Sequence, residues 1–267
     1  MIEINLGDGE KQYLYYDDSI LLKRLSLYPY VQLGVMVLFV LIVYFALIST
    51  KKAEQNKVWV GLSKETAHQL GTPISSLMAW MDLLESSGVD PSLLSDMNKD
   101  VNRLSIIAER FSKIGSKPEM ELIYVNEVLE NATEYMRRRV SDKVLITTHL
   151  PSDAEGAMVC LSLFEWVIEN LCKNAVDAMN GEGRIDVYMT SEKQQIYIDI
   201  KDTGKGIARK NFKTVFNPGY TTKKRGWGLG LTLAKRIIED YHAGRIYVKD
   251  SEVGKGTTFR IELKRVV

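Results

Sequence analysis

The sequence predicts an α-helical membrane segment, then a helical hairpin that forms a dimeric four-helix bundle, and then an α/β sandwich. Three observations predict this order. An uncharged apolar run covers residues 31–48, two helical apolar stripes flank a break at residues 88–91, and residues 119–267 alternate between helix-like and strand-like patterns. The length of 267 residues is typical of about two domains.

The charge balance and the cysteine content argue against two classes of protein. Lysine and arginine total 35 while aspartate and glutamate total 34, so the net charge of +1 gives no reason to expect direct nucleic-acid binding. Cys160 and Cys172 lie in apolar helical context, which predicts core packing rather than a disulfide framework.

Val31–Ile48 is a candidate membrane helix because it carries no charged residue. At ~1.5 Å per residue it spans roughly 27 Å, close to the ~30 Å hydrocarbon core of a bilayer. Tyr28 and Tyr30 suit an interface, so we assign a transmembrane helix to residues 28–50 and a short N-terminal segment to residues 1–27. A helix buried in a soluble core is the alternative.

Residues 51–115 predict two antiparallel helices joined at Gly88-Val89-Asp90-Pro91, with Pro91 suited to opening the second helix. The apolar stripes follow helical spacing through Leu62, Ala67, Leu70, Ile74, Leu77, Trp80, Met81 and Leu84, and then through Leu93, Leu94, Met97, Val101, Leu104, Ile107, Ala108 and Phe111. One hairpin leaves an apolar face uncovered, so we expect two copies to pair as a C₂ homodimer.

Residues 119–267 follow a linker at residues 115–118 and mix both kinds of element. Helical patterns cover residues 125–140, 162–179 and 229–241, and strand-like patterns cover residues 144–150, 184–190, 195–201, 244–250 and 256–264. Helices on one face of a mixed sheet make an α/β sandwich.

Five residues of this region suit a nucleotide and its metal. Asn170 and Asn174 are four residues apart, so their amide oxygens share one helix face and offer the hard ligands that Mg²⁺ prefers. Asp202 ends a strand-like run, where a carboxylate can accept a hydrogen bond from the exocyclic amine of adenine. Gly204 and Gly206 allow positive φ and a close approach of the backbone to a ligand.

A glycine-rich segment precedes the helical pattern at residues 231–240, and backbone N–H groups at a helix start favour phosphate. Its glycines and the first helical residue are Gly226, Gly228, Gly230 and Leu231. A Gly-x-x-x-x-Gly-Lys-Ser/Thr motif is absent from the sequence, so a P-loop is not supported.

Taken in order, these segments resemble a bacterial sensor histidine kinase. The run Glu65-Thr66-Ala67-His68-Gln69-Leu70-Gly71-Thr72-Pro73 is similar to the phosphoacceptor box, residues 170–178 are similar to the N box, and residues 202–206, 226–231 and 254–259 are similar to the glycine boxes. The resemblance implies an ATP-binding domain of Bergerat (GHKL) type. It implies ATP and Mg²⁺ as ligands, with Asn170 and Asn174 at the metal.

The resemblance also implies a reaction and partners. We expect autophosphorylation of His68, phosphoryl transfer to an aspartate on a response-regulator receiver domain, and in some members of the family phosphatase activity toward that regulator. Because ATP is cytoplasmic, we expect a protein of the cytoplasmic membrane whose kinase region lies in the cytoplasm. Residues 1–27 would then lie on the extracytoplasmic side. That segment is too short for a sensor core. Either the signal arrives through the membrane or a partner, or an upstream span is missing.

Two further segments carry roles by resemblance. Residues 215–223 are similar to the F box and the start of an ATP lid, where Thr222 and Lys223 can contact the terminal phosphates. A mobile basic loop is the alternative. Thr257 matches the threonine that supports adenine recognition beside the aspartate, and Thr258 is the alternative.

The phosphoacceptor box departs from the family at Gln69, where Glu or Asp is usual. An amide cannot take the imidazole proton near neutral pH, although it can hold the tautomer by a hydrogen bond. Glu65 lies three residues before His68 and either supplies the missing carboxylate or is a solvated surface charge. Thr72 matches the residue that positions water in phosphatase-active relatives.

The sequence therefore predicts a membrane-bound histidine autokinase. Its rival is an ATP-binding signalling adaptor without autokinase activity, for which Gln69 would mark lost chemistry. A GHKL ATPase of the chaperone or mismatch-repair type is a third possibility, but such proteins have no His box on a dimerising hairpin.

Overall fold

The computed structural model describes residues 2–5, 11–14, 20–116, 118–223 and 228–266. The chain divides into two compact units, residues 1–59 and residues 60–267. In the first unit, β1 (Ile2–Asn5) and β2 (Lys11–Leu14) pair as an antiparallel ribbon. The helix α1 (Ile20–Ser86) begins in this unit and continues into the second.

The apolar run lies within α1, with no break between the expected membrane and hairpin segments. In the described residues one helical stretch, Leu27–Lys51, is long and apolar enough to cross a membrane, with a mean hydropathy of 2.7 and none of it buried. The same helix continues through Pro73, so the proline does not end it. The helix begins at Ile20, before this stretch, and the stretch itself differs from the predicted segment of residues 28–50 by one residue at each end.

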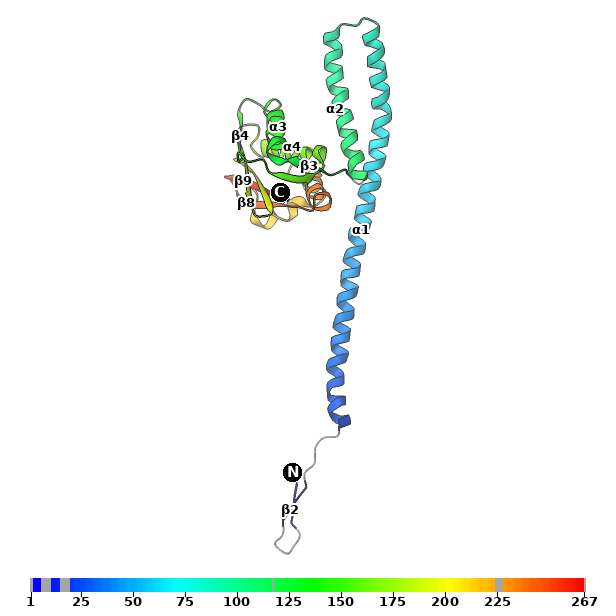
Figure 1. The fold of residues 1–267 in the computed structure, drawn as a ribbon, viewed down its shortest axis with the longest axis vertical. Helices are drawn as coiled ribbons and strands as arrows, with labels where there is room; N and C mark the ends of the chain where they lie inside the picture. The colour runs from blue at the N-terminus through cyan, green and yellow to red at the C-terminus, as the bar shows by residue number, and fades with distance from the viewer. Residues whose placement is uncertain (1, 6–10, 15–19, 117, 224–227, 267) are drawn as a thin grey trace. The chain divides into compact units, whose positions relative to one another are not determined.

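The predicted hairpin is present in the second unit, where α2 (Pro91–Gly115) returns beside the C-terminal part of α1 (Figure 1). Pro91 opens α2, and the Asp90 carboxylate caps it by accepting a hydrogen bond of 2.8 Å from Ser92 N. The hairpin core is formed by Ile74, Met81, Val101 and Ala108, with Leu70 packed against it.

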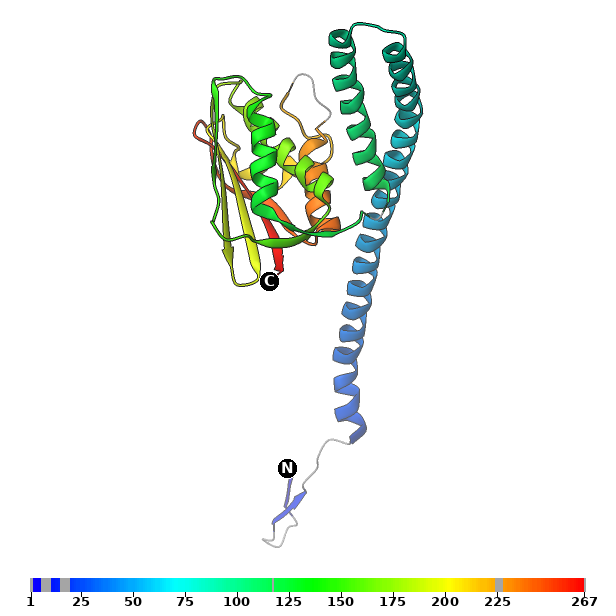
Figure 2. The same cartoon turned by 45° about the horizontal axis from the view of Figure 1, so that its top comes forward.

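The rest of the second unit is an α/β sandwich whose helices cover one face of a seven-stranded sheet (Figures 1 and 2). The strands are β3 (Glu121–Tyr124), β4 (Val144–His149), β5 (Gly156–Val159), β6 (Gly183–Glu192), β7 (Gln195–Asp202), β8 (Arg245–Glu252) and β9 (Gly256–Val266). The helices are α3 (Val125–Arg137), α4 (Leu161–Ala178) and α5 (Gly230–Arg236), with short turns η1 (Arg209–Asn211) and η2 (Thr214–Phe216) and the π-helix η3 (Ile237–Tyr241).

The sheet is mixed, as the sequence predicts. Its order is β3-β5-β9-β7-β6-β4, with β8 on β9, and β4 and β6 are its parallel pair. Core packing comes from the inner faces of the strands and from α4. Its largest fully buried side chains include Phe164, Leu171, Ile196, Ile198 and Ile200. The two cysteines are free and buried in this core, and burial raises the pKa of the Cys172 thiol to about 12.

Three features differ from the sequence prediction. The strands β3 and β5 were missed because four residues are too few for alternation to register. The turn after β6 lies at residues 193–194 rather than 191–193. The helix expected over residues 229–241 ends as a π-helix, in which His242 N donates to Ile237 O at 3.2 Å.

Candidate functional site

Asp202 is the most informative residue of the sandwich because it is buried where an apolar residue belongs. Along β7, Ile196, Ile198 and Ile200 point into the core at every second position, and Asp202 continues that series at 3% exposure. Carboxylates are rarely buried without a partner, since desolvation penalises the charged form. Burial of the Asp202 carboxylate therefore costs desolvation free energy.

The Asp202 carboxylate is held by backbone donors on one side only. Gly204 N donates to Oδ1 at 2.8 Å and Thr257 N donates to the same oxygen at 3.3 Å, whereas the described residues donate nothing to Oδ2. Burial raises the pKa of the Asp202 carboxyl, and the bonds from Gly204 and Thr257 act in the opposite direction. Oδ2 remains as an acceptor for a donor that the described residues do not supply.

The strand register selects between the two threonines that the sequence left open. Asp202 of β7 lies opposite Thr257 of β9, and Thr258 lies opposite Lys201. Thr257 is 4% exposed, and its hydroxyl lies 2.9 Å from that of Ser251. Thr257 is therefore the threonine beside the aspartate, and Ser251 is a neighbour that sequence reasoning missed.

The loop after Asp202 needs glycine because it is wedged against two other elements. A Cβ on Gly204 would lie 2.8 Å from Ala178 at the end of α4, and Gly206, with φ of 72°, would place one 2.1 Å from Glu252 O. Lys205 N donates to Ala178 O at 3.0 Å, and Gly254 N donates to Lys205 O at 2.8 Å. The loop thus closes one end of the region around Asp202.

The two asparagines of α4 come together beside the start of α5. A Cβ on Gly230 would lie 3.3 Å from Asn170 Oδ1 and 3.8 Å from Asn174 Nδ2. The Asn170 Nδ2 atom is buried without a hydrogen-bond partner in the described part of the chain. An orphaned buried amide is costly and points to a missing ligand or water.

Of the two residues expected to contact terminal phosphates, Lys223 reaches α4 and Thr222 reaches the loop after β7. Lys223 Nζ donates to Asn174 Oδ1 at 3.2 Å and also pairs with the Asp177 carboxylate. Thr222 Oγ1 accepts a hydrogen bond of 2.9 Å from Lys205 Nζ. The pair between Lys223 and Asp177 is about 40% exposed, so it contributes ~0–1 kcal/mol and a phosphate can replace it.

The structure describes only some of the remaining residues of the glycine-rich segment before α5. Gly226 lies outside the described residues. Gly228 has φ of 64°, which favours glycine, and Leu231 packs partly buried against the core. Asp177 was not predicted, although its place three residues after Asn174, on the same helix face, is the signal that points to it.

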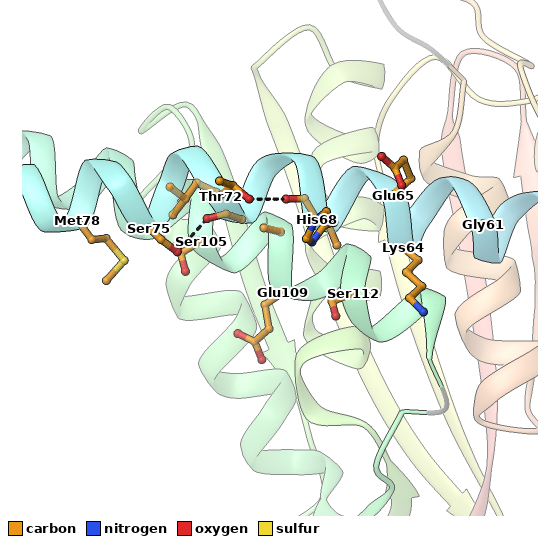
Figure 3. A pocket seen from close by; sticks show the side chains of 14 residues that line it. Gly61, Lys64, Glu65, His68, Thr72, Ser75, Met78, Ser105, Glu109 and Ser112 are labelled. Carbon is orange, nitrogen blue, oxygen red and sulfur yellow. Dashed lines mark hydrogen bonds between the residues drawn. The ribbon is translucent and has the colours of Figure 1, made fainter.

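His68 lies in a groove of the hairpin, apart from the residues just described. The groove has a volume of about 910 Å³, and the residues around it belong only to α1 and α2 (Figure 3). Its lining is Gly61, Lys64, Glu65, Ala67, His68, Gly71, Thr72, Ile74, Ser75, Met78, Ser105, Ala108, Glu109 and Ser112. His68 is exposed.

The neighbours of His68 make contacts that the sequence did not specify. Gln69 Nε2 donates to Glu65 Oε1 at 2.8 Å, so the amide holds the carboxylate one turn away. The Thr72 hydroxyl donates to His68 O at 3.3 Å and would have to rotate to position water. The other two histidines make structural contacts: His149 stacks on Tyr188, and His242 is buried with bonds to Ile237 O and Cys160 N.

The sandwich is similar to a known family of ATPases, and most of the chain is similar to known kinases. Residues 159–267 match the family of histidine kinase-, DNA gyrase B- and HSP90-like ATPases. Sporulation kinase A of Bacillus subtilis is 26% identical over 220 residues, which are 80% of this chain and 36% of that protein. Sensor histidine kinase ZraS of Salmonella typhimurium is 26% identical over 226 residues, 81% of this chain and 48% of that protein.

Solved structures agree on the fold. The catalytic domain of histidine kinase ThkA has a TM-score of 0.51 at 22% identity and covers 55% of this chain and 96% of that domain. Full-length ShkA, solved with AMPPNP, has a TM-score of 0.58 at 18% identity and covers 78% of this chain and 46% of that one. The family match and these structures confirm the expected GHKL ATP-binding sandwich, and the curated relatives confirm the resemblance to sensor histidine kinases. The chain spans half or less of the length of sporulation kinases A, C, D and E.

Proposed function

We propose that this chain, whose relatives are sensor histidine kinases, is a membrane-bound histidine autokinase of a two-component system. One observation carries the proposal. The same chain holds a buried carboxylate with a free acceptor oxygen in an ATP-binding fold, and an exposed histidine in the groove of a helical hairpin. The first group suits adenine, and the second suits a phosphoryl acceptor.

The residues present fit a nucleotide with Mg²⁺. Asp202 Oδ2 would accept from the exocyclic amine of adenine, with Thr257 beside it, and Asn170 and Asn174 would hold the metal. The Lys223 ammonium already donates to Asn174 Oδ1, so this position suits a positive charge. The Asn170 Nδ2 atom has no hydrogen-bond partner among the described residues, so it can bind a further ligand. When bound, Mg²⁺ would neutralise charge on the phosphates.

In the reaction, an imidazole nitrogen of His68 attacks the γ-phosphorus of ATP. The N–P bond forms as the bond from that phosphorus to the bridging β–γ oxygen breaks, and ADP leaves. The chain's own contribution is mainly positioning and charge neutralisation, with Thr222 and Lys223 on the terminal phosphates. A receiver-domain aspartate then attacks the same phosphorus, and His68 is released.

Partners follow from the same proposal. ThkA, which has a TM-score of 0.53 to this chain at 19% identity, was solved in complex with the response regulator TrrA. A response-regulator receiver domain is the acceptor that we propose here. We also propose a homodimer through the hairpin, because Leu77, Trp80, Met97 and Leu104 of the predicted stripes remain exposed on the single hairpin.

The test of the function is incubation of a fragment from Lys51 onward with γ-labelled ATP and Mg²⁺. We expect label that is lost in acid and stable in base, as for a phosphoramidate. The label should then move to a receiver domain when one is added. Tight ATP binding with no label under any condition would sink the autokinase and favour the adaptor.

We expect Gln69→Glu to raise the autophosphorylation rate. A carboxylate beside His68 can take the imidazole proton, but a neutral imidazole already has a nucleophilic lone pair. The gain should therefore lie below the usual ~10²–10⁴-fold range of general-base catalysis, at roughly tenfold. Single-turnover labelling at saturating ATP measures this rate.

The hydrogen bond between Gln69 and Glu65 predicts that the two positions are coupled. If Glu65 is the base, Glu65→Gln should slow the native enzyme and have little effect beside Gln69→Glu. A double-mutant cycle measures that non-additivity. Additive effects would leave Glu65 as a solvated charge and Gln69 as a positioning residue.

We expect the full-length protein to pellet with membranes and to resist extraction by high salt and by carbonate. Residues 31–48 are apolar, helical and exposed, and a bilayer would cover them. A fragment from Lys51 onward should be soluble and dimeric at micromolar concentration by light scattering. A full-length protein that stays in solution without detergent contradicts the membrane assignment, and a monomeric fragment contradicts the paired hairpin.

A further inference from the structure

Lys64 lies one helical turn before His68 on α1, and both residues line the same groove. Residues four apart on a helix share a face, and Figure 3 draws the two side chains on the same side of α1. Thr72 continues the row one turn after His68. A phosphoryl group on His68 would therefore have the Lys64 side chain one turn before it and the Thr72 side chain one turn after it, whose hydroxyl would first have to turn from His68 O.

The backbone of Lys64 is fixed by close packing of the two helices. A Cβ on Gly115 would lie 3.0 Å from Lys64 N and 3.1 Å from Lys64 Cβ. A larger residue at position 115 would push the helices apart. The base of the Lys64 side chain is thus held against the end of α2, and Figure 3 draws the rest of the side chain toward α2.

The charges around the groove leave the Lys64 ammonium uncommitted. Glu109, on the facing helix, pairs with Lys113 at 2.9 Å. The Glu65 carboxylate, which also lines the groove, accepts from Gln69, and Figure 3 draws it on the other side of α1 from the Lys64 ammonium. In the described part of the chain, no carboxylate lies within ion-pair distance of Lys64 Nζ.

We propose that Lys64 is a further catalytic residue, whose ammonium neutralises the phosphoryl oxygens as the phosphorus is transferred to and from His68. This inference rests on the proposed function. The bonds formed and broken are those of the phosphoryl transfer already given, in which an N–P bond forms at His68 and ADP departs. Lys64 keeps its protons throughout and supplies charge, as lysines do at other phosphoryl-transfer sites.

The test compares Lys64→Met, Lys64→Arg and a control, Lys99→Met, in the full chain in detergent. Lys99 is exposed on α2, pairs with Asp96 and does not line the groove, so the control removes the same charge elsewhere on the hairpin. Single-turnover labelling at saturating ATP gives the forward rate, and adding excess ADP to the phosphorylated protein gives the reverse rate. Calorimetry gives the ATP affinity.

We expect Lys64→Met to slow both rates about tenfold, less than for a buried donor because the groove is open to water. Its ATP affinity should not change, Lys64→Arg should keep most of the rate, and Lys99→Met should be unaffected. Wild-type rates in Lys64→Met would overturn the proposal, as would equal losses in Lys64→Met and Lys64→Arg. Absence of label in the native protein would instead sink the proposed function, so the two failures are distinguishable.

Discussion

His68→Gln is expected to abolish labelling by γ-labelled ATP while leaving the ATP affinity nearly unchanged. Glutamine is close to histidine in size and polarity, but its amide nitrogen offers no lone pair for attack on phosphorus. The groove of His68 is lined by α1 and α2, whereas the proposed nucleotide contacts come from the sandwich. Label stoichiometry and calorimetric titration with ATP measure the two properties separately.

The matched control for this prediction is His149→Gln. His149 lies on β4 and stacks on Tyr188, outside both the groove and the proposed nucleotide contacts. That variant should label at the wild-type rate. Persistent stoichiometric label on His68→Gln would remove His68 from its assigned role, and loss of label in both variants would point to misfolding rather than to chemistry.

The parts of the fold that were predicted are those in which local patterns repeat. Alternation placed β7 and put Asp202 at its end, and helical spacing placed α4 with both asparagines on one face. The break at residues 88–91 located the hairpin turn because Asp90 and Pro91 carry their own capping chemistry. Each of these signals lies within a few residues of the feature that it predicts.

The contacts that were missed join residues that are distant in sequence. Lys223 meets Asp177 across 46 positions, and no local pattern specifies such a pair. The choice of Thr257 over Thr258 required the register between β7 and β9, because a shift of one residue turns a side chain to the other face. The π-helix after α5 depends on how Ile237 and His242 pack, which composition does not reveal.

Asp202→Asn is expected to weaken ATP binding strongly. The amide oxygen of asparagine can keep the bonds from Gly204 N and Thr257 N, so the change mainly replaces Oδ2 with an NH₂ group. That group would face the exocyclic amine of adenine, donor against donor. An unsatisfied buried pair costs ~1–3 kcal/mol, or about 5- to 150-fold in Kd. Asp250→Asn, at an exposed position on β8, is the matched control for loss of one charge.

The same substitution should not destabilise the nucleotide-free protein, which separates recognition from folding. Burial raises the pKa of Asp202 above its ordinary 3.8. A group of this kind contributes stability below its unfolded pKa, and the contribution is lost as the pH rises through the folded value. Asparagine does not titrate, so at pH 7 the variant should unfold at the wild-type temperature or above it. As the pH falls toward 4, the unfolding temperature of wild type should rise relative to that of the variant. Thermal unfolding without ATP at both pH values measures this.

Wild-type ATP affinity in the variant would contradict the adenine contact, and a lower unfolding temperature at pH 7 would mean that the ionised carboxylate stabilises the loop after β7.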